Sequence, residues 1–408
     1  MTATTSSTTT STRDRRRRQT AVRAARLFDG TGAATVPDPL VVIEDGRIAS
    51  VEFGPRAVAP PGAETVDLPG ATLLPGLVDA HVHLAFDGGP DSVGALAGRD
   101  DDAVLDAMAV AAAAQLAAGV TTVRDLGDRD YLALRLRERP GPLPTIAAAG
   151  PPITSAGGHC HFLGGEAVQG VDGVRAAVRE HAARGVDVIK VMASGGNLTP
   201  GSDALTEQFG PAELAALVAE AHRHGLPVTA HAHALSSIED AVAAGVDGLE
   251  HCSFMTPDGV RAPDELLAMI VARRIAVSGT LGVVPCPGMP GPPPAMLRHL
   301  PAMIAAHARL VALGALYVVG TDAGIGPVKP HGVLPHGLAD LAKLGMTPAA
   351  VLRTGTSTAA QVCGFGDRKG RVAPGFDADL LAVDGDPTVD LLALQRPLAV
   401  LAGGRRIR

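Results

Sequence analysis

Aromatic side chains are almost missing from this chain of 408 residues. Phe, Tyr and Trp make up 2% of the sequence, with two tyrosines and no tryptophan. Proteins that bind single-stranded nucleic acid stack the bases on aromatic rings, and nucleic-acid binders in general are basic. This chain instead has a formal net charge of -7. The composition therefore argues against nucleic acid as the main partner.

Cysteines and long apolar runs are also scarce. The four cysteines (Cys160, Cys252, Cys286 and Cys363) show no C-x-x-C spacing, so a disulfide framework is not expected. No apolar stretch approaches the roughly 18 residues of a membrane span, and segment 1–20 lacks the hydrophobic part of a secretion signal. We expect a cytoplasmic protein without a membrane partner, in which residues 1–20 form a disordered tail. A homo-oligomer is one of the alternatives that the sequence leaves open.

Both ends of the chain carry short β patterns. Residues 40–43 and 47–51 are short β patterns on either side of Glu-Asp-Gly, which is the arrangement of a β-hairpin. The end of the chain has the same character. We predict that segments 21–70 and 367–408 pair into one small β-sandwich domain.

The residues between these ends, 71–366, alternate between apolar β-like runs and alanine-rich helical segments. The expected strands are 73–80, 120–123, 145–149, 186–189, 227–230, 248–250, 275–278 and 316–321. Helices are expected at 103–118, 174–184, 211–224 and 236–244, each followed by a glycine that can end it. This alternation predicts the α/β class and a (β/α)8 TIM barrel. The Pro- and Gly-rich segment 284–294 is predicted to be a loop over the catalytic face.

Residues that can bind metal ions stand at the ends of several of these runs: His81, His83, Lys190, His231, His251 and Asp322. A parallel barrel gathers the carboxyl ends of its strands at one face, where active sites lie. His81 and His83 are two residues apart on a strand and therefore share a face. The same holds for His231 and His233, so spacing does not decide which of those two binds metal. The pattern predicts a metal centre.

The order H-x-H, Lys, His, His, Asp lies within a longer set of motifs. They are Leu-Pro-Gly-Leu-Val-Asp-Ala-His-Val-His at 74–83, Ala-Gly-Val-Asp-Gly-Leu-Glu-His at 244–251, Gly-Thr-Asp-Ala-Gly at 320–324 and Gly-Phe-Asp-Ala-Asp-Leu at 375–380. Together they resemble the amidohydrolase superfamily of metal-dependent hydrolases over nearly the whole chain. Within it they are most similar to the binuclear prolidase-like branch, which is also labelled imidazolonepropionase-like.

The resemblance implies two divalent metal ions. The expected ligands, from their chemistry and their positions in the family motifs, are His81, His83 and Asp322 for the more buried ion. His231 and His251 are expected to bind the second ion. Members of this branch carry a carboxylated lysine whose carbamate bridges the ions, which implies the same for Lys190. The ligand set suits zinc, although Mn, Co and Fe accept it too. A hydroxide bridging the ions is the expected nucleophile, with Asp322 as general acid and base.

Further residues lie near this predicted centre. The candidate substrate contacts, each with the plain alternative of a loop or packing residue, are His159, His161, His233 and His331. His336 follows in the same loop region as His331. Glu250, beside His251, is expected to orient a metal ligand. Arg124 and Asp125 are expected to form an internal ion pair.

The expected activity is hydrolysis of a carbon–nitrogen bond, most simply an amide, in a small molecule. Ring opening of an imidazolone or lactam is an alternative, but single-metal relatives of that kind generally lack the strand-four lysine, so Lys190 weighs against it. An Xaa-Pro dipeptidase-like activity is disfavoured because neither Tyr131 nor Tyr317 follows the fifth strand, where some relatives anchor the substrate carboxylate. A non-catalytic scaffold is disfavoured because all six candidate ligands are present.

Overall fold

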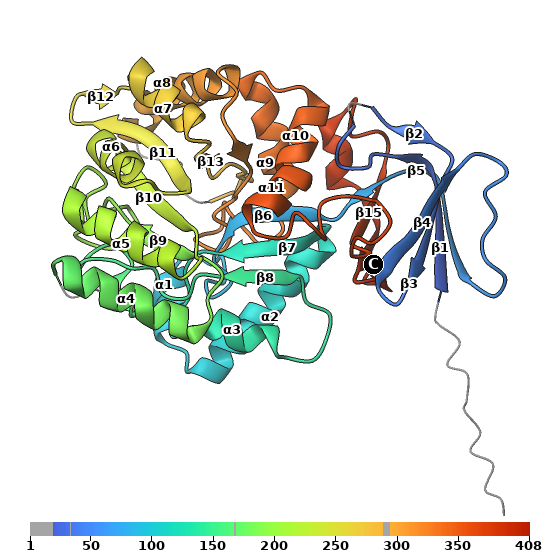
Figure 1. Cartoon of the computed structure of the whole chain (residues 1–408), viewed down its shortest axis with the longest axis horizontal. Helices are drawn as coiled ribbons and strands as arrows, with labels where there is room; N and C mark the ends of the chain where they lie inside the picture. Colours follow the sequence, from blue (N-terminus) through green and yellow to red (C-terminus); the bar gives the residue numbers. More distant parts are fainter. Residues whose placement is uncertain (1–18, 33, 167–168, 289–293) are drawn as a thin grey trace, which may run out of the picture.

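The structure is a computed structural model that describes residues 19–32, 34–166, 169–288 and 294–408. It has an α/β fold with parallel sheets, as the sequence predicted. Figure 1 shows a β-sheet built from both chain ends beside a larger body of alternating strands and helices. Residues 1–18, the main part of the predicted tail, lie outside the described residues.

The sheet of the chain ends contains eight strands. They are β1 (Gln19–Leu27), β2 (Val36–Pro37), β3 (Pro39–Glu44), β4 (Arg47–Phe53), β5 (Glu64–Pro75), β15 (Leu380–Asp384), β16 (Pro397–Ala402) and β17 (Arg405–Arg406). Antiparallel pairing of β15 with β5 joins the two ends, so the predicted pairing of the termini is confirmed. One boundary was wrong, because β1 begins at Gln19 and not after residue 20.

The turn between β3 and β4 explains why this hairpin forms. Asp45 and Gly46 both have positive φ angles, of 49° and 80°, and lie between the paired residues Glu44 and Arg47. Two-residue turns of this kind match the right-handed twist of the strands and favour Asp-Gly. The predicted hairpin is confirmed.

All eight strands expected in the larger body are present. They are β6 (Leu77–Val82), β7 (Val120–Asp125), β8 (Thr145–Ala148), β9 (Ile189–Met192), β10 (Val228–Ala234), β11 (Gly248–Thr256), β13 (Ala276–Ser278) and β14 (Tyr317–Val318). They pair in parallel as two sheets, β6-β7-β8 and β9-β10-β11-β13-β14, and β12 (Gly259–Val260) adds an antiparallel pair to β11. Single bridges link the sheets, between Ile153 and Val191 and between Val82 and Ala323. Strand one starts later than predicted, since residues 73–75 belong to β5.

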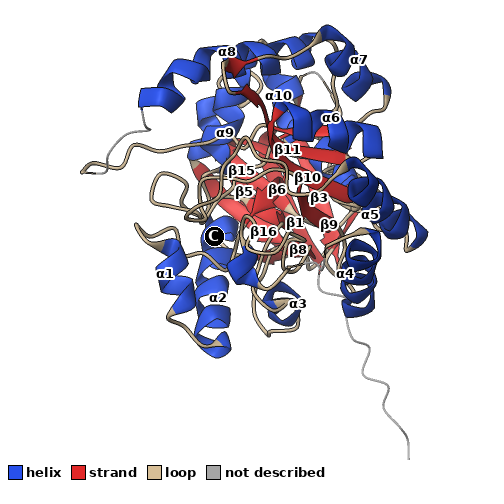
Figure 2. Cartoon of the chain, turned by 90° about the vertical axis from the view of Figure 1, so that its left-hand side faces the viewer, coloured by secondary structure: helices blue, strands red, loops and turns tan. Residues whose placement is uncertain are grey.

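Helices surround these strands (Figure 2). They are α1 (Ser92–Ala97), α2 (Asp101–Ala117), α3 (Leu132–Arg137), α4 (Val171–Arg184), α5 (Pro211–Arg223), α6 (Leu235–Ala244), α7 (Asp264–Ala272), α8 (Pro294–Ala312), α9 (Leu334–Leu341), α10 (Pro348–Thr354) and α11 (Ser357–Val362), with short 3-10 turns at His161–Leu163, Ala342–Leu344 and Leu391–Gln395. The four predicted helices match α2, α4, α5 and α6. Gly185 and Gly245 end α4 and α6 in the left-handed conformation, which glycine adopts without strain.

The largest buried cluster joins the parallel strands to the inner faces of the helices and is built mainly from Ala, Val and Leu. Leu381 of β15 belongs to this cluster, and a Cβ on Gly119 would lie only 2.8 Å from its side chain. The end sheet therefore packs closely on the turn that precedes β7. Among the described helices, none is long and apolar enough to cross a membrane. All four cysteines are free thiols.

The predicted loop 284–294 is described only in part. Residues 289–293 lie outside the described residues, and α8 begins at Pro294. The backbone N–H of Val284 donates to the carbonyl of Val328 at 2.9 Å, so the start of this loop lies on the segment that follows β14.

Candidate metal centre

The carboxyl ends of the parallel strands carry the predicted ligands. His81 lies in β6 and His83 just after it, Lys190 lies in β9, His231 in β10, His251 in β11, and Asp322 follows β14. Two groups of these side chains have ligand atoms close enough to hold a metal ion: His81, His83 and Asp322, and His231, His233 and His251. We call them the first and the second ligand group. Side chains that are 241 positions apart in the chain thus meet at one face, as expected for parallel strands.

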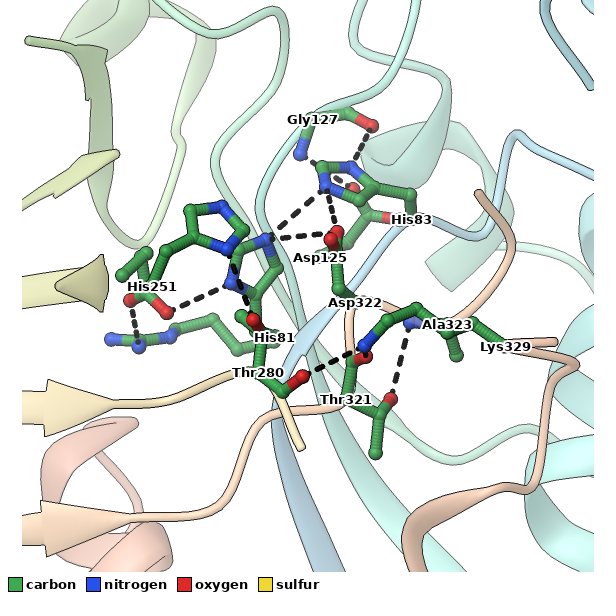
Figure 3. A network of polar contacts seen from close by, with 12 residues as sticks. His81, His83, Asp125, Gly127, His251, Thr280, Thr321, Asp322, Ala323 and Lys329 are labelled. Carbon is green, nitrogen blue, oxygen red and sulfur yellow. Dashed lines mark hydrogen bonds and ion pairs between the residues drawn. The ribbon is translucent and has the colours of Figure 1, made fainter. Parts of the chain in front are cut away.

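In the first ligand group, three atoms converge (Figure 3). The Nε2 atoms of His81 and His83 lie 3.2 Å apart, and Asp322 Oδ1 lies 3.5 Å from the first and 3.2 Å from the second. His83 donates from Nδ1 to the carbonyl of Gly127 at 3.0 Å. This tautomer leaves the lone pair of Nε2 free for a metal ion.

His81 is held from the opposite side by a carboxylate. Glu250 Oε2 accepts from His81 Nδ1 at 2.8 Å, and Glu250 Oε1 accepts from Arg124 Nη2 at 2.9 Å and from Thr229 Oγ1 at 2.6 Å. All four side chains are buried. The expected role of Glu250 as an orienting residue is therefore realised on His81, across the strands, and not on its neighbour His251.

The ion pair predicted between Arg124 and Asp125 was wrong. Successive side chains of a strand point to opposite faces, so Arg124 reaches Glu250 while Asp125 turns away. Asp125 instead accepts hydrogen bonds from the backbone N–H groups of Leu84 at 2.8 Å and Gly127 at 3.1 Å. It thereby fixes the backbone on both sides of the His83 ring.

Glycine makes room for the first ligand group. A Cβ on Gly320, just after β14, would lie 2.6 Å from the Cβ of His81. Real side chains do not approach so closely, and only glycine allows β14 and β6 to come together here. Asp322, two residues further on, then reaches the histidines with a positive φ angle of 63°.

The second ligand group is held by neutral partners. His231 Nε2 donates to the carbonyl of Gly195 at 3.0 Å, His233 Nδ1 lies 2.8 Å from Ser253 Oγ, and His251 Nδ1 lies 3.0 Å from Thr280 Oγ1. Each ring therefore keeps its other nitrogen free. The three ring centroids lie 4.6 Å from one another. The structure brings His233 into this group beside His231, and the choice of His231 as the ligand stays a prediction.

Lys190 is fully buried, with 1% of its surface exposed. In the described part of the chain its ammonium has no hydrogen bond and no ion-pair partner. Burial lowers the pKa of Lys190 to about 8, although the charges of Glu250 and Asp322 oppose this shift. A buried cation without a partner is unfavourable, so the surroundings make the proton easier to remove and increase the fraction of neutral amine near pH 7.

The histidines around Lys190 are mostly held neutral. Burial, with the charge of Lys190 as a further cause, lowers the pKa of His81 and His233 to about 4 and places that of His251 well below its usual value. His83 differs: burial alone would lower its pKa, but the hydrogen bond and charge of Asp322 outweigh burial and raise it. Asp322 has a lowered pKa, since its hydrogen bond with His83 and the nearby histidine charges outweigh burial. Neutral imidazole and ionised carboxylate are the forms that bind metal ions.

The predicted substrate contacts fall into different places. His159 is buried, its ring lies 4.8 Å from that of His231, and its Nδ1 has no hydrogen-bond partner among the described residues. His161 bonds within its own loop, to the carbonyl of Gly158 at 2.9 Å. His331 lies 2.8 Å from the carbonyl of Phe86 through Nε2, so it ties the loop after β14 to the loop after β6. His336 lies on α9 and not in the loop.

Two residues of the site were missed by the sequence reasoning. Asp79 is fully buried and accepts from the backbone N–H and the hydroxyl of Thr321, at 3.0 and 2.6 Å. Its position two residues before His81, on the same face of β6, was a usable signal. Lys329, in the loop after β14, donates to the carbonyls of Thr280 and Thr321. Nothing in the local sequence indicates these contacts.

A comparison with protein families gives one match across most of the chain. A sequence model described as "Amidohydrolase family" matches residues 72–407. The chain belongs to the amidohydrolase family. The match confirms the resemblance drawn from the motifs and covers the segment that contains both ligand groups. Metal binding by this amidohydrolase is consistent with its family and with the two groups of ligating side chains.

Similar proteins were also found among characterised sequences and solved structures. Imidazolonepropionase of Cereibacter sphaeroides is 30% identical over 91% of this chain and 94% of its own length. Ochratoxinase of Aspergillus niger is 30% identical over 57% of this chain, and that match spans only 48% of the fungal protein. The crystal structure of an Xaa-Pro dipeptidase with bound methionine superposes with a TM-score of 0.82 at 26% identity, over 95% of this chain and 99% of that one.

Proposed function

We propose that this amidohydrolase cleaves an amide C–N bond of a small molecule with the help of two divalent metal ions. The observation that carries the proposal is the pair of ligand groups at the carboxyl strand ends, with an unpaired buried lysine whose charge acts on both groups. The ligands would be His81, His83 and Asp322 for the first ion and His231 and His251 for the second. Their nitrogen and oxygen atoms suit zinc.

Lys190 would complete the centre as a carbamate. A neutral lysine amine adds to carbon dioxide: the nitrogen forms a bond to carbon, one N–H proton leaves, and the product is a carboxylate on the side chain. The lowered pKa of Lys190 supplies the neutral amine, and the absence of a partner among the described residues leaves its nitrogen free to react. The anion would lie among histidines and near Asp322, where its charge requires the cations that it would help to bind.

When bound, the two ions would lower the pKa of water and polarise the scissile carbonyl, which side chains alone do much less well. Asp322 would move the proton. Its Oδ1 faces His81 and His83, whereas Oδ2 has no hydrogen-bond partner in the described residues. We assign to Oδ2 the uptake of the proton from the attacking water and its delivery to the leaving nitrogen, as general base and then general acid.

His159 is the strongest candidate for a side chain that contacts the substrate. Its unpaired buried Nδ1, next to the ring of His231, can hydrogen-bond a polar atom of the substrate. His233 is the second candidate, because it stands in the second ligand group whether or not it binds the ion. His161 and His331 are weaker candidates, since each has a hydrogen-bond partner in its own or a neighbouring loop.

The two tyrosines disfavour a dipeptidase activity. Tyr131 lies at the start of α3 with its hydroxyl 3.3 Å from His181, and Tyr317 bonds His307 at 2.8 Å. Neither contacts a ligand group. Opening of a cyclic amide is the second candidate function, favoured by the likeness to imidazolonepropionase over 91% of the chain.

We further propose that the two parallel sheets close into one (β/α)8 barrel that begins with β6, and that the strands of the two chain ends, β1–β5 and β15–β17, form a β-sandwich. The bridges at Ile153 and Val82 support the closure. In the sheet of the chain ends, Val22 and Val41 share a buried cluster with Leu380 and Leu401, which supports two facing layers. The cytoplasmic location and a homo-oligomer stay predictions from the sequence.

Elemental analysis of the purified chain beside a Lys190→Ala variant tests the proposal. Both proteins are assayed on N-acyl amino acids, dipeptides, aryl amides and lactams. We expect about two metal ions per chain, with metal content and turnover falling together in the variant. Lys343→Ala is the matched control, because Lys343 is exposed and, among the residues that the structure describes, pairs with Asp340 on α9 alone. One ion or none, with turnover independent of Lys190, would contradict the binuclear mechanism.

A further inference from the structure

Two lysines lie at the carboxyl end of the strands, and they differ in their partners. Lys329 Nζ donates to the carbonyl oxygens of Thr280 and Thr321, both at 2.7 Å (Figure 3). Lys190 has no such acceptor among the described residues. Carbonyl oxygens accept hydrogen bonds and are attracted to a cation, so Lys329 has the surroundings of an ammonium group. The two lysines therefore differ in their support for a positive charge: two carbonyl oxygens surround the ammonium of Lys329, and none accepts from Lys190 among the described residues.

The two carbonyls lie where the strands stop pairing. Strands β13 and β14 pair only at Val277 with Tyr317 and at Ser278 with Val318. Thr280 and Thr321 lie beyond the last pair, where no ladder hydrogen bond connects the two segments. An unpaired buried carbonyl is unfavourable. The ammonium of Lys329 satisfies both oxygens and takes the place of the missing ladder.

Each of these threonines is attached to a different ligand group. Thr280 accepts or donates through Oγ1 at 3.0 Å from His251 Nδ1, in the second ligand group. Thr321 immediately precedes Asp322, in the first ligand group. One ammonium thus connects the backbone behind His251 to the backbone behind Asp322.

The backbone at these positions needs such support. Thr280, Asp322 and His251 have positive φ angles of 48°, 63° and 65°. Non-glycine residues adopt this conformation at a cost and keep it only where the surroundings fix it. Thr321 is also fixed by Asp79, which accepts from its N–H and its hydroxyl. In the described residues, Lys329 is the one side chain that bonds both strained segments.

We propose that Lys329 is a positioning residue that acts as a cation to hold the two ligand groups at fixed positions relative to each other. We call this role the cationic clamp. The inference rests on the proposed function, because it concerns how His251 and Asp322 are presented to the ions. It assigns different roles to the two lysines: Lys329, which is half-buried, holds the backbone as an ammonium, and Lys190, which is buried, binds the ions as a carbamate.

A crossed chemical rescue distinguishes these roles. Lys329→Ala and Lys190→Ala proteins, full length and freed of metal, are titrated with Co²⁺ while the visible absorption of the bound cobalt is recorded. Each titration is repeated with ethylammonium chloride, with sodium propionate, and with sodium chloride at the same ionic strength. Ethylammonium supplies the lost cation and propionate the lost carboxylate.

For Lys329→Ala we expect an altered cobalt spectrum and an apparent affinity lower by about 10- to 100-fold, the range found when groups that orient metal ligands are removed. Ethylammonium restores both in a saturable way, and propionate does not. For Lys190→Ala the pattern is reversed. In turnover, loss of Lys329 lowers kcat more than it raises KM, because the ions are misplaced while the substrate pocket is kept. Lys343→Ala behaves as the wild-type protein.

A Lys329→Met variant keeps the inference falsifiable if the alanine variant does not fold, because it retains the apolar stem without the charge. Wild-type cobalt binding in Lys329→Met, or a folded Lys329→Ala protein that ethylammonium does not restore, would overturn the cationic clamp. Rescue of Lys329→Ala by ethylammonium combined with no rescue of Lys190→Ala by propionate would keep the clamp and reject the carbamate. The two hypotheses thus fail separately.

Discussion

The two ligand groups are supported in different ways. The first is backed by charged side chains: Glu250, itself paired with Arg124, holds His81, and Asp322 is one of the ligands. The second is backed by neutral groups, namely the hydroxyls of Ser253 and Thr280 and one backbone carbonyl. Charge-assisted hydrogen bonds are about twice as strong as neutral ones. The first group is therefore more firmly held before any ion binds.

The backbone does not repeat this contrast, because each group has one ligand with a positive φ angle, Asp322 at 63° in the first and His251 at 65° in the second. The histidines of the first group lie on or just after the regular strand β6. In the second group, His251 and the following Cys252 have positive φ angles of 65° and 50°, and fixed surroundings must hold them there. From its charged support we infer that the first group sets the position of the centre and that the second adapts to it. The following predictions test this difference, from the largest expected effect to the smallest.

Replacing Asp322 by Asn should have the largest effect. The amide keeps the size of the side chain and an oxygen ligand, but it cannot take up and return a proton. We expect kcat to fall by about 10²- to 10⁴-fold, the usual contribution of a general acid or base. Steady-state kinetics with metal content measured on the same sample gives the answer. Asp340→Asn, on α9, is the control, and a kcat within tenfold of wild type would contradict the assignment.

Glu250→Gln should weaken metal binding more than Ser253→Ala does. Loss of the carboxylate behind His81 is expected to lower metal affinity by about 10- to 100-fold. Loss of the Ser253 hydroxyl removes one neutral hydrogen bond, with a net value of about 1 kcal/mol. Competition with a chelator measures both affinities. An equal or larger loss in Ser253→Ala would show that the charged support of the first group has no special weight.

Gly320→Ala should disturb the first ligand group through sterics alone. The new Cβ would lie 2.6 Å from His81 Cβ, so β6 and β14 must separate. We expect a loss of stability of about 1–3 kcal/mol, as for other overpacked sites. Gly326→Ala is the matched control, since a Cβ there meets nothing within 4 Å. Urea unfolding of both variants checks this, and equal stabilities would contradict the close approach.

In the metal-free protein, the pH dependence of the free energy of unfolding should distinguish the two ligand groups. The pKa of His251 lies well below its usual value, mainly through burial, and below pH 6.5 the unfolded chain binds a proton that the folded chain refuses. Its contribution to stability is therefore present above pH 6.5 and is lost on acidification, by at most about 1.4 kcal/mol per pH unit. His83, with a raised pKa, contributes stability below pH 6.5 that is lost as pH rises.

Replacing these histidines should consequently change the slope of stability against pH in opposite directions. His251→Asn should make the acid-side loss between pH 6.5 and 4 shallower. His83→Asn should instead act above pH 6.5, where it removes the loss of stability that the wild-type protein shows as pH rises. Urea unfolding of the metal-free variants at a series of pH values measures the slopes. Slopes that change in the same direction would mean that the two groups do not differ electrostatically.

Much of the fold followed from local pattern. Alternation of apolar runs with helical segments located the eight parallel strands and four of the helices, because periodicity and glycine caps act over a few residues. The ends of these elements were less certain: Leu73, Leu74 and Pro75 belong to β5, since their pairing with β15 decides this and not their own sequence.

The candidate ligands could be predicted from the sequence equally well, because strand ends and the H-x-H spacing are local features. The contacts that support these ligands could not be predicted in this way. The partner of Arg124 turned out to be Glu250, 126 positions away, and Lys329 meets carbonyls at Thr280 and Thr321. Such contacts depend on how strands from distant parts of the chain are arranged, and no short segment encodes that arrangement.

The sequence by itself determined which residue types stand at the carboxyl ends of the strands, and with them the family and the kind of chemistry expected. Only the tertiary structure decided which nitrogen of each imidazole is free, which carboxylate holds His81, and that Lys329 has two carbonyl acceptors whereas Lys190 has none among the described residues. The physical reason is the distance along the chain over which each kind of interaction acts. Periodicity and caps depend on neighbours within a few residues, whereas burial, hydrogen-bond partners and the charge state of a buried group depend on side chains that meet only after the strands have assembled.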